Sequence, residues 1–322
     1  MRVSPSNSYQ GESFPLQGLG QCPKVLAFRK EVKIMSQKNK GVCCILLSSF
    51  SFALMNMFVR LSGDLPSIQK SFFRNFVAML FALMILLKER PEIKLDRDSK
   101  KFLVLRSVCG TLGILCNFYA VDHLVLADAS MLNKMSPFFA ILFGILILKE
   151  KINLFQGLCV VAAFTGTLFV IKPTPSNLAC FPALIGLLGG LGAGVAYTYV
   201  RALGMRGVKG PFIVFFFSAF SCVVTLPYLV FCYHPMTMAQ LGTLLLAGLA
   251  AAGGQFTITA AYTYAPAREI SVYDYSQIIF SAILGYFVFG QVSDAFSWLG
   301  YLIITSTAVA MFIRNNRPHV KV

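Results

Sequence analysis

The sequence predicts an all-α integral membrane protein with ten transmembrane helices, arranged as two inverted-topology five-helix repeats. Three observations predict this class: the hydropathy, the length of the apolar runs and the placement of the basic residues. The 322 residues have a mean hydropathy of +0.70, 57% of them are hydrophobic and only 13% are charged. A soluble domain of this length carries more charge, so lipid must replace water over much of the surface.

Apolar runs of about 18 to 22 residues recur along the chain, and this length crosses a bilayer core of roughly 30 Å as a helix. The runs do not alternate apolar and polar residues, as the strands of a membrane barrel would. We predict ten spans, with the boundaries 42–59, 71–87, 102–121, 129–148, 153–171, 181–200, 211–232, 239–262, 270–289 and 295–313.

The 28 Lys and Arg residues are divided unevenly between the two sides of these spans. With the N-terminus inside, 22 of them fall in cytoplasmic segments, and only Arg60, Lys70 and Lys172 fall in external loops. The positive-inside rule therefore predicts a multi-pass protein of the cytoplasmic membrane with both termini in the cytoplasm. This placement also accounts for the net charge of +15, so we do not expect nucleic acid as a partner.

The N-terminal segment 1–40 is polar, and we expect a disordered cytoplasmic segment there. It has no apolar core of a signal peptide, and one hypothesis is that residues 1–34 precede a native start at Met35. The nine cysteines are scattered, with no CxxC pair and no His at ligand spacing. They are typical of packing residues, so neither a metal site nor a cofactor is expected.

The rest of the chain divides into two repeats, 41–173 and 178–314, followed by a short cytoplasmic tail at 315–322. At an offset of 141 residues, 106–170 aligns with 247–311 without a gap. In both copies a helix with small residues ends in an aromatic-Ala stretch, and a short loop with an acid leads into the next helix. Five spans separate the copies, so they must be inverted, as in secondary transporters that hold substrate near the bilayer midplane.

The clearest motifs lie in the third and fourth spans. They are Arg106, Gly110, Gly113, Asn117-Phe-Tyr-Ala120, Leu126-Ala-Asp-Ala129, Pro137-Phe-Phe and Leu148-Lys-Glu150. This pattern resembles the EamA domain of the drug/metabolite transporter superfamily. A weaker copy follows in the second half, with the motifs Tyr264-Ala-Pro-Ala267, Tyr275 and Phe289-Gly-Gln291.

The resemblance extends over residues 40–314. It implies ten helices, cytoplasmic termini and a central cavity lined by the inner helices of each half. It also implies that Glu150 corresponds to the acid that closes the fourth helix in the family. Gln291 stands where many members have Glu in the second copy, which puts any role of that second acid in doubt.

Two charged residues inside the spans are the first site candidates. Lys134 lies in the fourth span, where a bare charge costs roughly 2.5–3.5 kcal/mol, and it either receives an acidic group of the substrate or has a structural role. Asp274 is the repeat equivalent of Asn133. We hypothesise a Lys134–Asp274 pair that opens on substrate binding or on protonation of Asp274. A permanent buried pair is the alternative.

Further candidates are polar or break a helix. Pro137 removes a backbone donor in mid-span and frees a carbonyl beside Asn133, which either lines the cavity or only kinks the helix. Arg74 and Arg106 lie near the ends of their spans, where we expect them to reach toward lipid headgroups, with substrate contact as the alternative. Gly186, Gly190 and Gly194 strip one face of the sixth span and predict close helix packing. The remaining cavity candidates are Asn117, Gln255, Tyr275 and Gln277.

These features predict a secondary transporter that exports a small polar metabolite by alternating access. A single central cation favours an amino acid or a related zwitterion or monoanion over a nucleotide sugar or phosphate ester, whose carriers are the runner-up. The histidines lie in loops or the tail and no acids are paired across spans, so an enzyme is not expected. A structural or sensory membrane protein stays open. The partners are then lipid and a small molecule, with a coupling proton and a homodimer left open.

Overall fold

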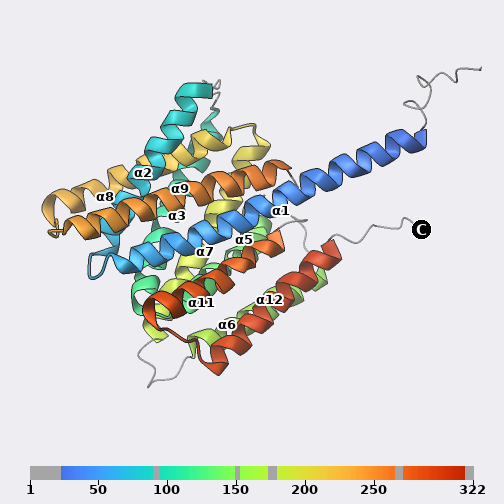
Figure 1. The fold of residues 1–322 in the computed structure, drawn as a ribbon. Helices are drawn as coiled ribbons and strands as arrows, with labels where there is room; N and C mark the ends of the chain where they lie inside the picture. The colour runs from blue at the N-terminus through green and yellow to red at the C-terminus, as the bar shows by residue number, and fades with distance from the viewer. Residues whose placement is uncertain (1–22, 90–94, 149–152, 173–179, 265–270, 316–322) are drawn as a thin grey trace, which may run out of the picture.

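The computed structural model describes residues 23–89, 95–148, 153–172, 180–264 and 271–315, and within these ranges every regular element is a helix (Figure 1). The elements are α1 (Pro23–Leu61), α2 (Ser67–Glu89), α3 (Arg97–His123), α4 (Leu126–Asn133), α5 (Ser136–Leu148), α6 (Leu154–Ile171), α7 (Cys180–Met205), α8 (Gly210–Phe231), α9 (Met238–Tyr264), η2 (Ser271–Tyr275, a 3-10 helix), α11 (Ser276–Phe289) and α12 (Ala295–Asn315).

Nine helical segments within the described ranges are long and apolar enough to cross a membrane. They correspond to nine of the predicted spans and confirm an all-helical membrane protein. The predicted span 270–289 corresponds instead to η2 followed by α11, and α11 alone has 14 residues. The tenth crossing and the inverted repeats therefore stay predictions.

The first helix is longer than predicted. We expected disorder up to residue 40, but α1 begins at Pro23. Residues 24–40 contain no glycine or proline and include five Lys, which is a good helix former, so the helix continues beyond the apolar part. Residues 1–22 lie outside the described residues. In Figure 1 this extension projects from the bundle on the side where α12 ends.

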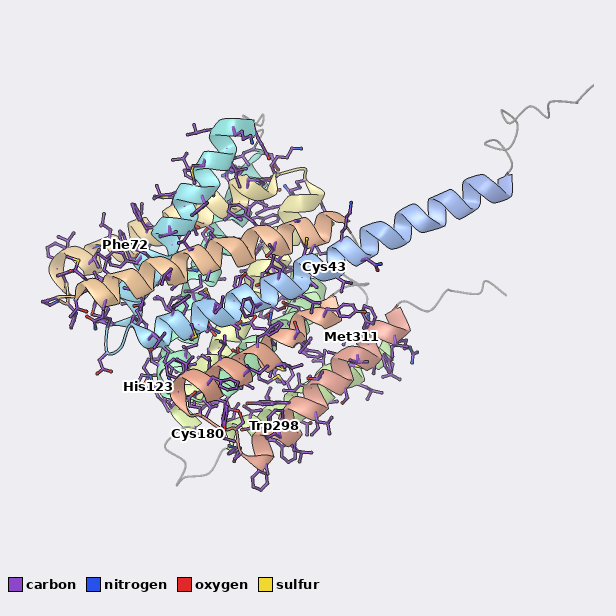
Figure 2. All side chains as sticks on the ribbon, viewed as in Figure 1. Cys43, Phe72, His123, Cys180, Trp298 and Met311 are labelled. Carbon is purple, nitrogen blue, oxygen red and sulfur yellow. The ribbon has the colours of Figure 1, made fainter. Side chains whose placement is uncertain are left out.

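The interior and the surface have the distribution of a membrane protein. Large apolar side chains are exposed on the outer faces of the helices, as the sticks of Figure 2 show. Many polar side chains are buried, among them Ser48, Asn56, Asn75, Thr111 and Gln277. Figure 2 places His123 and Cys180 toward one end of the bundle, and Cys43 and Met311 toward the other.

Two helices are interrupted at positions that the repeat alignment makes nearly equivalent. The fourth span is divided into α4 and α5 by a turn at Lys134 and Met135. Pro137 has no backbone N–H, so the chain cannot continue the α-helical bonding across this point. In the second half, the 3-10 helix η2 contains Asp274 and passes into α11. The fourth span is therefore interrupted beside Pro137, and a direct role of this residue at the cavity stays a prediction.

The glycine-rich face of α7 packs closely against its neighbours, as predicted, and the neighbours include the residues on both sides of this interruption. A Cβ on Gly190 would lie 2.5 Å from the carbonyl oxygen of Leu132, and one on Gly194 would lie 2.5 Å from the Cβ of Phe139. On a neighbouring face, Gly189 and Gly192 lie against the backbone of α3. Because these positions carry no side chain, α3, α4 and α5 all approach α7 at backbone distance.

Candidate functional site

A cavity of about 100 Å³ lies among the helices and is lined by both polar and apolar residues, including three cations. It is formed by residues of α1, α2, α3, α7, α8, α9 and α11 and by the interruption between α4 and α5. The polar side chains that line it are those of Asn56, Arg74, Arg106, Asn117, Asn133, Lys134, Ser136, Tyr197, Gln255 and Gln277, and the aromatic rings of Phe52, Phe118 and Phe217 line it too.

Lys134 and Asp274 form the predicted ion pair at this cavity. The Lys134 Nζ lies 2.5 Å from the Asp274 Oδ2, and Lys134 is only 8% exposed. The other carboxylate oxygen accepts a hydrogen bond from the Ser49 hydroxyl at 3.0 Å. Tyr275 donates its hydroxyl to the backbone carbonyl of Lys134 at 3.2 Å. Each charge therefore has a partner, and the pair ties both helix interruptions to α1.

A row of neutral polar groups extends from the same cavity across α3, α1 and α4 to α11. Asn117 donates to Asn56 at 3.4 Å, and Asn56 donates to the Ser130 hydroxyl at 3.4 Å. The hydroxyls of Ser130 and Ser281 are 2.7 Å apart. The Oδ1 of Asn117 is buried and has no hydrogen-bond partner in the part of the chain that the structure describes, so this amide retains an acceptor for a ligand or a water.

The remaining predicted candidates have different places. Asn133, Gln255 and Gln277 line the cavity together with Lys134 and Asn117. Tyr275 is buried in the core and supports the lysine backbone, and Pro137 acts through the helix break. Gln291 accepts from the Leu126 N–H at 3.0 Å at the beginning of α4, away from the cavity. Glu150 lies outside the described residues.

The expectation for the two arginines was wrong. Arg74 and Arg106 do not extend to the headgroups but are buried, with 6% and 5% of their surface exposed, and both line the cavity. Both arginines lie on the sides of α2 and α3 that neighbouring helices cover. The distance of a residue from the end of its helix does not indicate toward which side of the helix its side chain points. The premise of a single central cation is therefore also wrong. The sequence did contain a signal for a more cationic cavity. Arg74, Arg106 and Lys134 all lie in apolar spans, where an uncompensated charge is costly.

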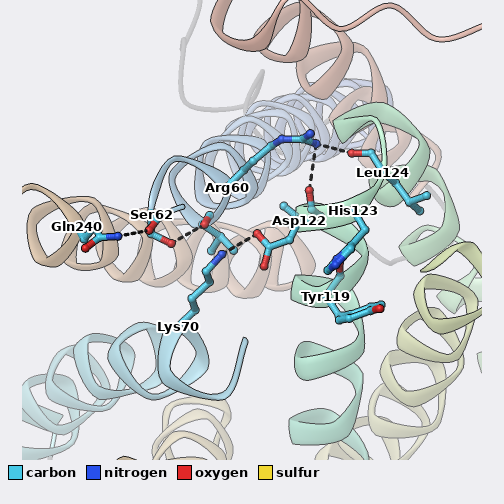
Figure 3. A network of polar contacts seen from close by, with 10 residues as sticks. Arg60, Ser62, Lys70, Tyr119, Asp122, His123, Leu124 and Gln240 are labelled. Atoms are coloured by element: carbon cyan, nitrogen blue, oxygen red, sulfur yellow. Dashed lines mark hydrogen bonds and ion pairs between the residues drawn. The ribbon is translucent and has the colours of Figure 1, made fainter. Parts of the chain in front are cut away.

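Beyond the cavity, a second polar network joins the ends of four helices (Figure 3). Lys70, whose side chain is fully buried, lies 2.7 Å from the Asp122 carboxylate. Arg60 donates to the carbonyls of Val121 and Leu124. Gln240 of α9 donates to the Ser62 carbonyl at 3.1 Å. We had assigned Arg60 and Lys70 to an external loop, but both belong to helices and bind α3.

The order of residues along three helices places this network next to the cavity. On α1 the cavity residue Asn56 is followed about one turn later by Arg60 of the network, and on α3 the cavity residue Phe118 is followed about one turn later by Asp122. On α2, which runs the other way, Lys70 precedes Arg74 by one turn. The network therefore lies between the cavity and the end of the bundle where His123 is found.

An apolar exterior around a buried, charged and partly unsatisfied cavity defines a class, the polytopic membrane transporters of small molecules. Comparisons with known proteins agree with this class. The model of the EamA-like transporter family matches residues 39–172. The pseudopaline exporter CntI of Pseudomonas aeruginosa strain UCBPP-PA14 is 33% identical over 280 residues, which cover 86% of this chain and 98% of that protein.

The chain belongs to the EamA-like transporters of the drug/metabolite transporter superfamily, and it is a transporter rather than an enzyme. More distant relatives include the riboflavin transporter of Rhizobium johnstonii, 26% identical over 86% of this chain and 91% of that protein. Human solute carrier family 35 member G1 is 25% identical over 85% of this chain and 79% of that protein. One crystal structure resembles this fold with a TM-score of 0.60 at 15% sequence identity. The match covers 88% of this chain and 99% of the chain in that crystal structure, and it supports the fold.

Proposed function

We propose that the protein is a secondary transporter that exports a small polar metabolite from the cytoplasm by alternating access at the central cavity. The observation that carries the proposal is the buried Lys134–Asp274 pair, which joins the interruptions of two helices at the cavity wall. Interrupted helices at membrane depth occur where backbone lines a substrate site. A pair that holds two such helices together is suited to couple occupancy of the cavity to their movement.

The chemistry of the pair suggests how it would open. An acidic group of the substrate that reaches Lys134 competes with Asp274 for the ammonium group. Alternatively, protonation of Asp274 removes its charge, and a coupling proton would then drive the step. Either event weakens an interaction that is strong only because water is largely excluded from it.

We further propose that the network of Figure 3 closes the external end of the transport path in this conformation. Export requires that end to open, so the Lys70–Asp122 pair would separate during each cycle. The orientation rests on the positive-inside rule, which assigns both termini to the cytoplasm. The N-terminal end of α1 and the C-terminal end of α12 lie on one side of the bundle (Figure 1), which supports an even number of crossings.

Ten crossings in two inverted repeats, 41–173 and 178–314, agree best with these features. Lys134 and Asp274 lie at nearly equivalent positions of the aligned copies, and both interrupt a helix. On this proposal, η2 and α11 together form the ninth crossing, since residues 271–289 approach the length of a bilayer core. A homodimer is not needed for the cavity, which a single chain forms.

The proposal is tested by comparing cells that overproduce the protein with cells that overproduce Lys134→Ala. Metabolites of medium and cytoplasm are measured, with an empty vector as reference. We expect at least one small acidic solute to accumulate in the medium only with the native protein. No difference from the empty vector would contradict export, whereas equal export by the variant would leave transport intact and remove the role of Lys134. Quantifying both proteins in the membrane controls for expression.

A further inference from the structure

Two buried arginines in the cavity lack the partners that buried charges require. Within the described ranges, Arg106 has no hydrogen-bond partner for Nε or Nη1, and Arg74 has none for Nε. Neither forms an ion pair with any residue that the structure describes. A guanidinium stays protonated in proteins, so the cavity wall carries two positive charges that the surrounding protein does not neutralise. The third cation, Lys134, is already paired.

One aromatic ring packs against the guanidinium of Arg106. Its Cζ lies 3.6 Å from the centroid of the Phe217 ring, which occupies one face of the guanidinium. A Cβ on Gly110 would lie 3.0 Å from Nη1 and 2.9 Å from that ring, so glycine makes room for the stacked pair. Stacking covers the plane of the group and leaves the N–H donors at its rim for an acceptor.

Arg74 is oriented by a neutral amide. Its Nη1 donates to the Asn75 Oδ1 at 2.6 Å, and the Asn75 amide donates in turn to the Ser221 hydroxyl at 2.8 Å. An amide fixes the direction of the side chain without cancelling its charge. The result is a fixed cation on α2 and another on α3, both facing one cavity.

We infer that Arg74 and Arg106 together form the binding site for a small organic dianion, whose oxyanion groups are two carboxylates or one phosphate. This inference rests on the proposed transport function and deepens it by naming the charge of the substrate. The charge balance carries it: the cavity lining holds three cations, and among the residues that the structure describes Asp274 is the only acid paired with any of them. A zwitterion or monoanion would leave at least one guanidinium uncompensated. The planar N–H fork of arginine matches both kinds of oxyanion.

The test uses the purified full-length protein in detergent and measures the midpoint of thermal unfolding against ligand concentration at constant ionic strength. Succinate is the dicarboxylate probe, glycerol phosphate is the phosphate-monoester probe and succinamide is the uncharged control. We expect stabilisation by at least one dianion and none by succinamide. Stabilisation by succinate alone identifies a dicarboxylate site, and stabilisation by glycerol phosphate alone identifies a phosphate-ester site. No stabilisation by either dianion overturns the inference.

Three variants separate binding from structural support. Arg74→Gln and Arg106→Gln should each weaken dianion binding by about tenfold to a hundredfold, the usual value of a hydrogen bond to a charged group. Arg106→Lys keeps the charge but loses the fork, and it should retain part of the affinity. Without ligand, both Gln variants should unfold no earlier than the native protein, because an unpaired buried charge is removed. A lower midpoint together with undiminished dianion binding would show a merely structural role.

Lys172→Gln is the matched control, because it removes an exposed cation outside the cavity. It should leave dianion binding unchanged. The export proposal and the dianion site can be contradicted independently of each other. If a solute is exported equally by the native protein, Arg74→Gln and Arg106→Gln, the dianion site is wrong and the transporter proposal stands. If succinate or glycerol phosphate binds through the arginines but no solute leaves the cell, the site stands and the export proposal fails.

Discussion

Lys134 and Asp274 show what a buried charge needs in a membrane. Each has the other within 2.5 Å, the carboxylate also accepts from Ser49, and the lysine backbone is bound by Tyr275. A bare charge at this depth would cost several kcal/mol. The pair therefore satisfies both residues in this conformation, while Arg74 and Arg106 in the same cavity have no such partner.

Reversal of the charges at this pair gives a direct prediction. Lys134→Asp and Asp274→Lys each place like charges in contact, and we expect each to lower stability by about 3–5 kcal/mol, as for other broken buried pairs. The double variant restores opposite charges and should recover most of that loss. The thermal unfolding of all four proteins in detergent measures the coupling. Additive losses in the double variant would contradict the pairing.

The exposed pair Lys172–Asp294 is the control for this cycle. Its side chains are 31% and 49% exposed, and its Nζ–Oδ1 distance of 2.6 Å is nearly as short as the 2.5 Å of the buried pair. Because water screens it, the same swap there should change stability by no more than about 1 kcal/mol. A large coupling at both pairs would show that distance rather than burial determines the energy.

The sequence was informative about residues only where their partners could be placed. The repeat offset set Asp274 against Asn133, next to Lys134, and the pair is present. The same reasoning did not place Arg74 and Arg106, because hydropathy gives a depth in the span but not the direction of a side chain around the helix. That direction is determined by the packing of α2, α3 and α8, which a single sequence does not contain.

At the scale of elements, α7 determines how closely the interrupted helix approaches. Its glycines face backbone atoms of α3 and of the α4–α5 turn, so this helix sets the position of Lys134. The glycine spacing in the sequence was enough to predict close packing. The extension of α1 and the 3-10 form of η2 were not predicted, since neither changes the hydropathy of a span.

Alanine substitutions along α7 test this role. Gly194→Ala would place a Cβ 2.7 Å from the Ser136 carbonyl oxygen and 2.5 Å from the Phe139 Cβ, and overpacking of this kind costs about 1–3 kcal/mol. Gly204→Ala has no atom within 4 Å of its Cβ, and it should be neutral or stabilise the helix by up to about 1 kcal/mol. Unfolding midpoints of the two variants are compared in one detergent. Equal midpoints would mean that α7 yields to the added methyl group.

At the scale of the whole molecule, composition and span length predicted the all-helical membrane class, and nine spans agree with it. Orientation is a separate property, because it depends on a small difference in loop charge between the two sides. The described helices would pack equally well either way up. The orientation is decided by measuring from which side of the membrane a reagent reaches a given loop.

The two ends of α8 provide that measurement. Cys232 is exposed at the C-terminal end of this helix, and Lys209 is exposed at its N-terminal end. With both termini in the cytoplasm, a membrane-impermeant thiol reagent should label Cys232 in intact cells, and Cys232→Ser should lose that share of the label. Adding Lys209→Cys to Cys232→Ser should restore labelling only after the membrane is permeabilised. The opposite labelling pattern would show that the orientation is the reverse. The network of Lys70 and Asp122 would then close the cytoplasmic end of the cavity, as an importer facing outward would require.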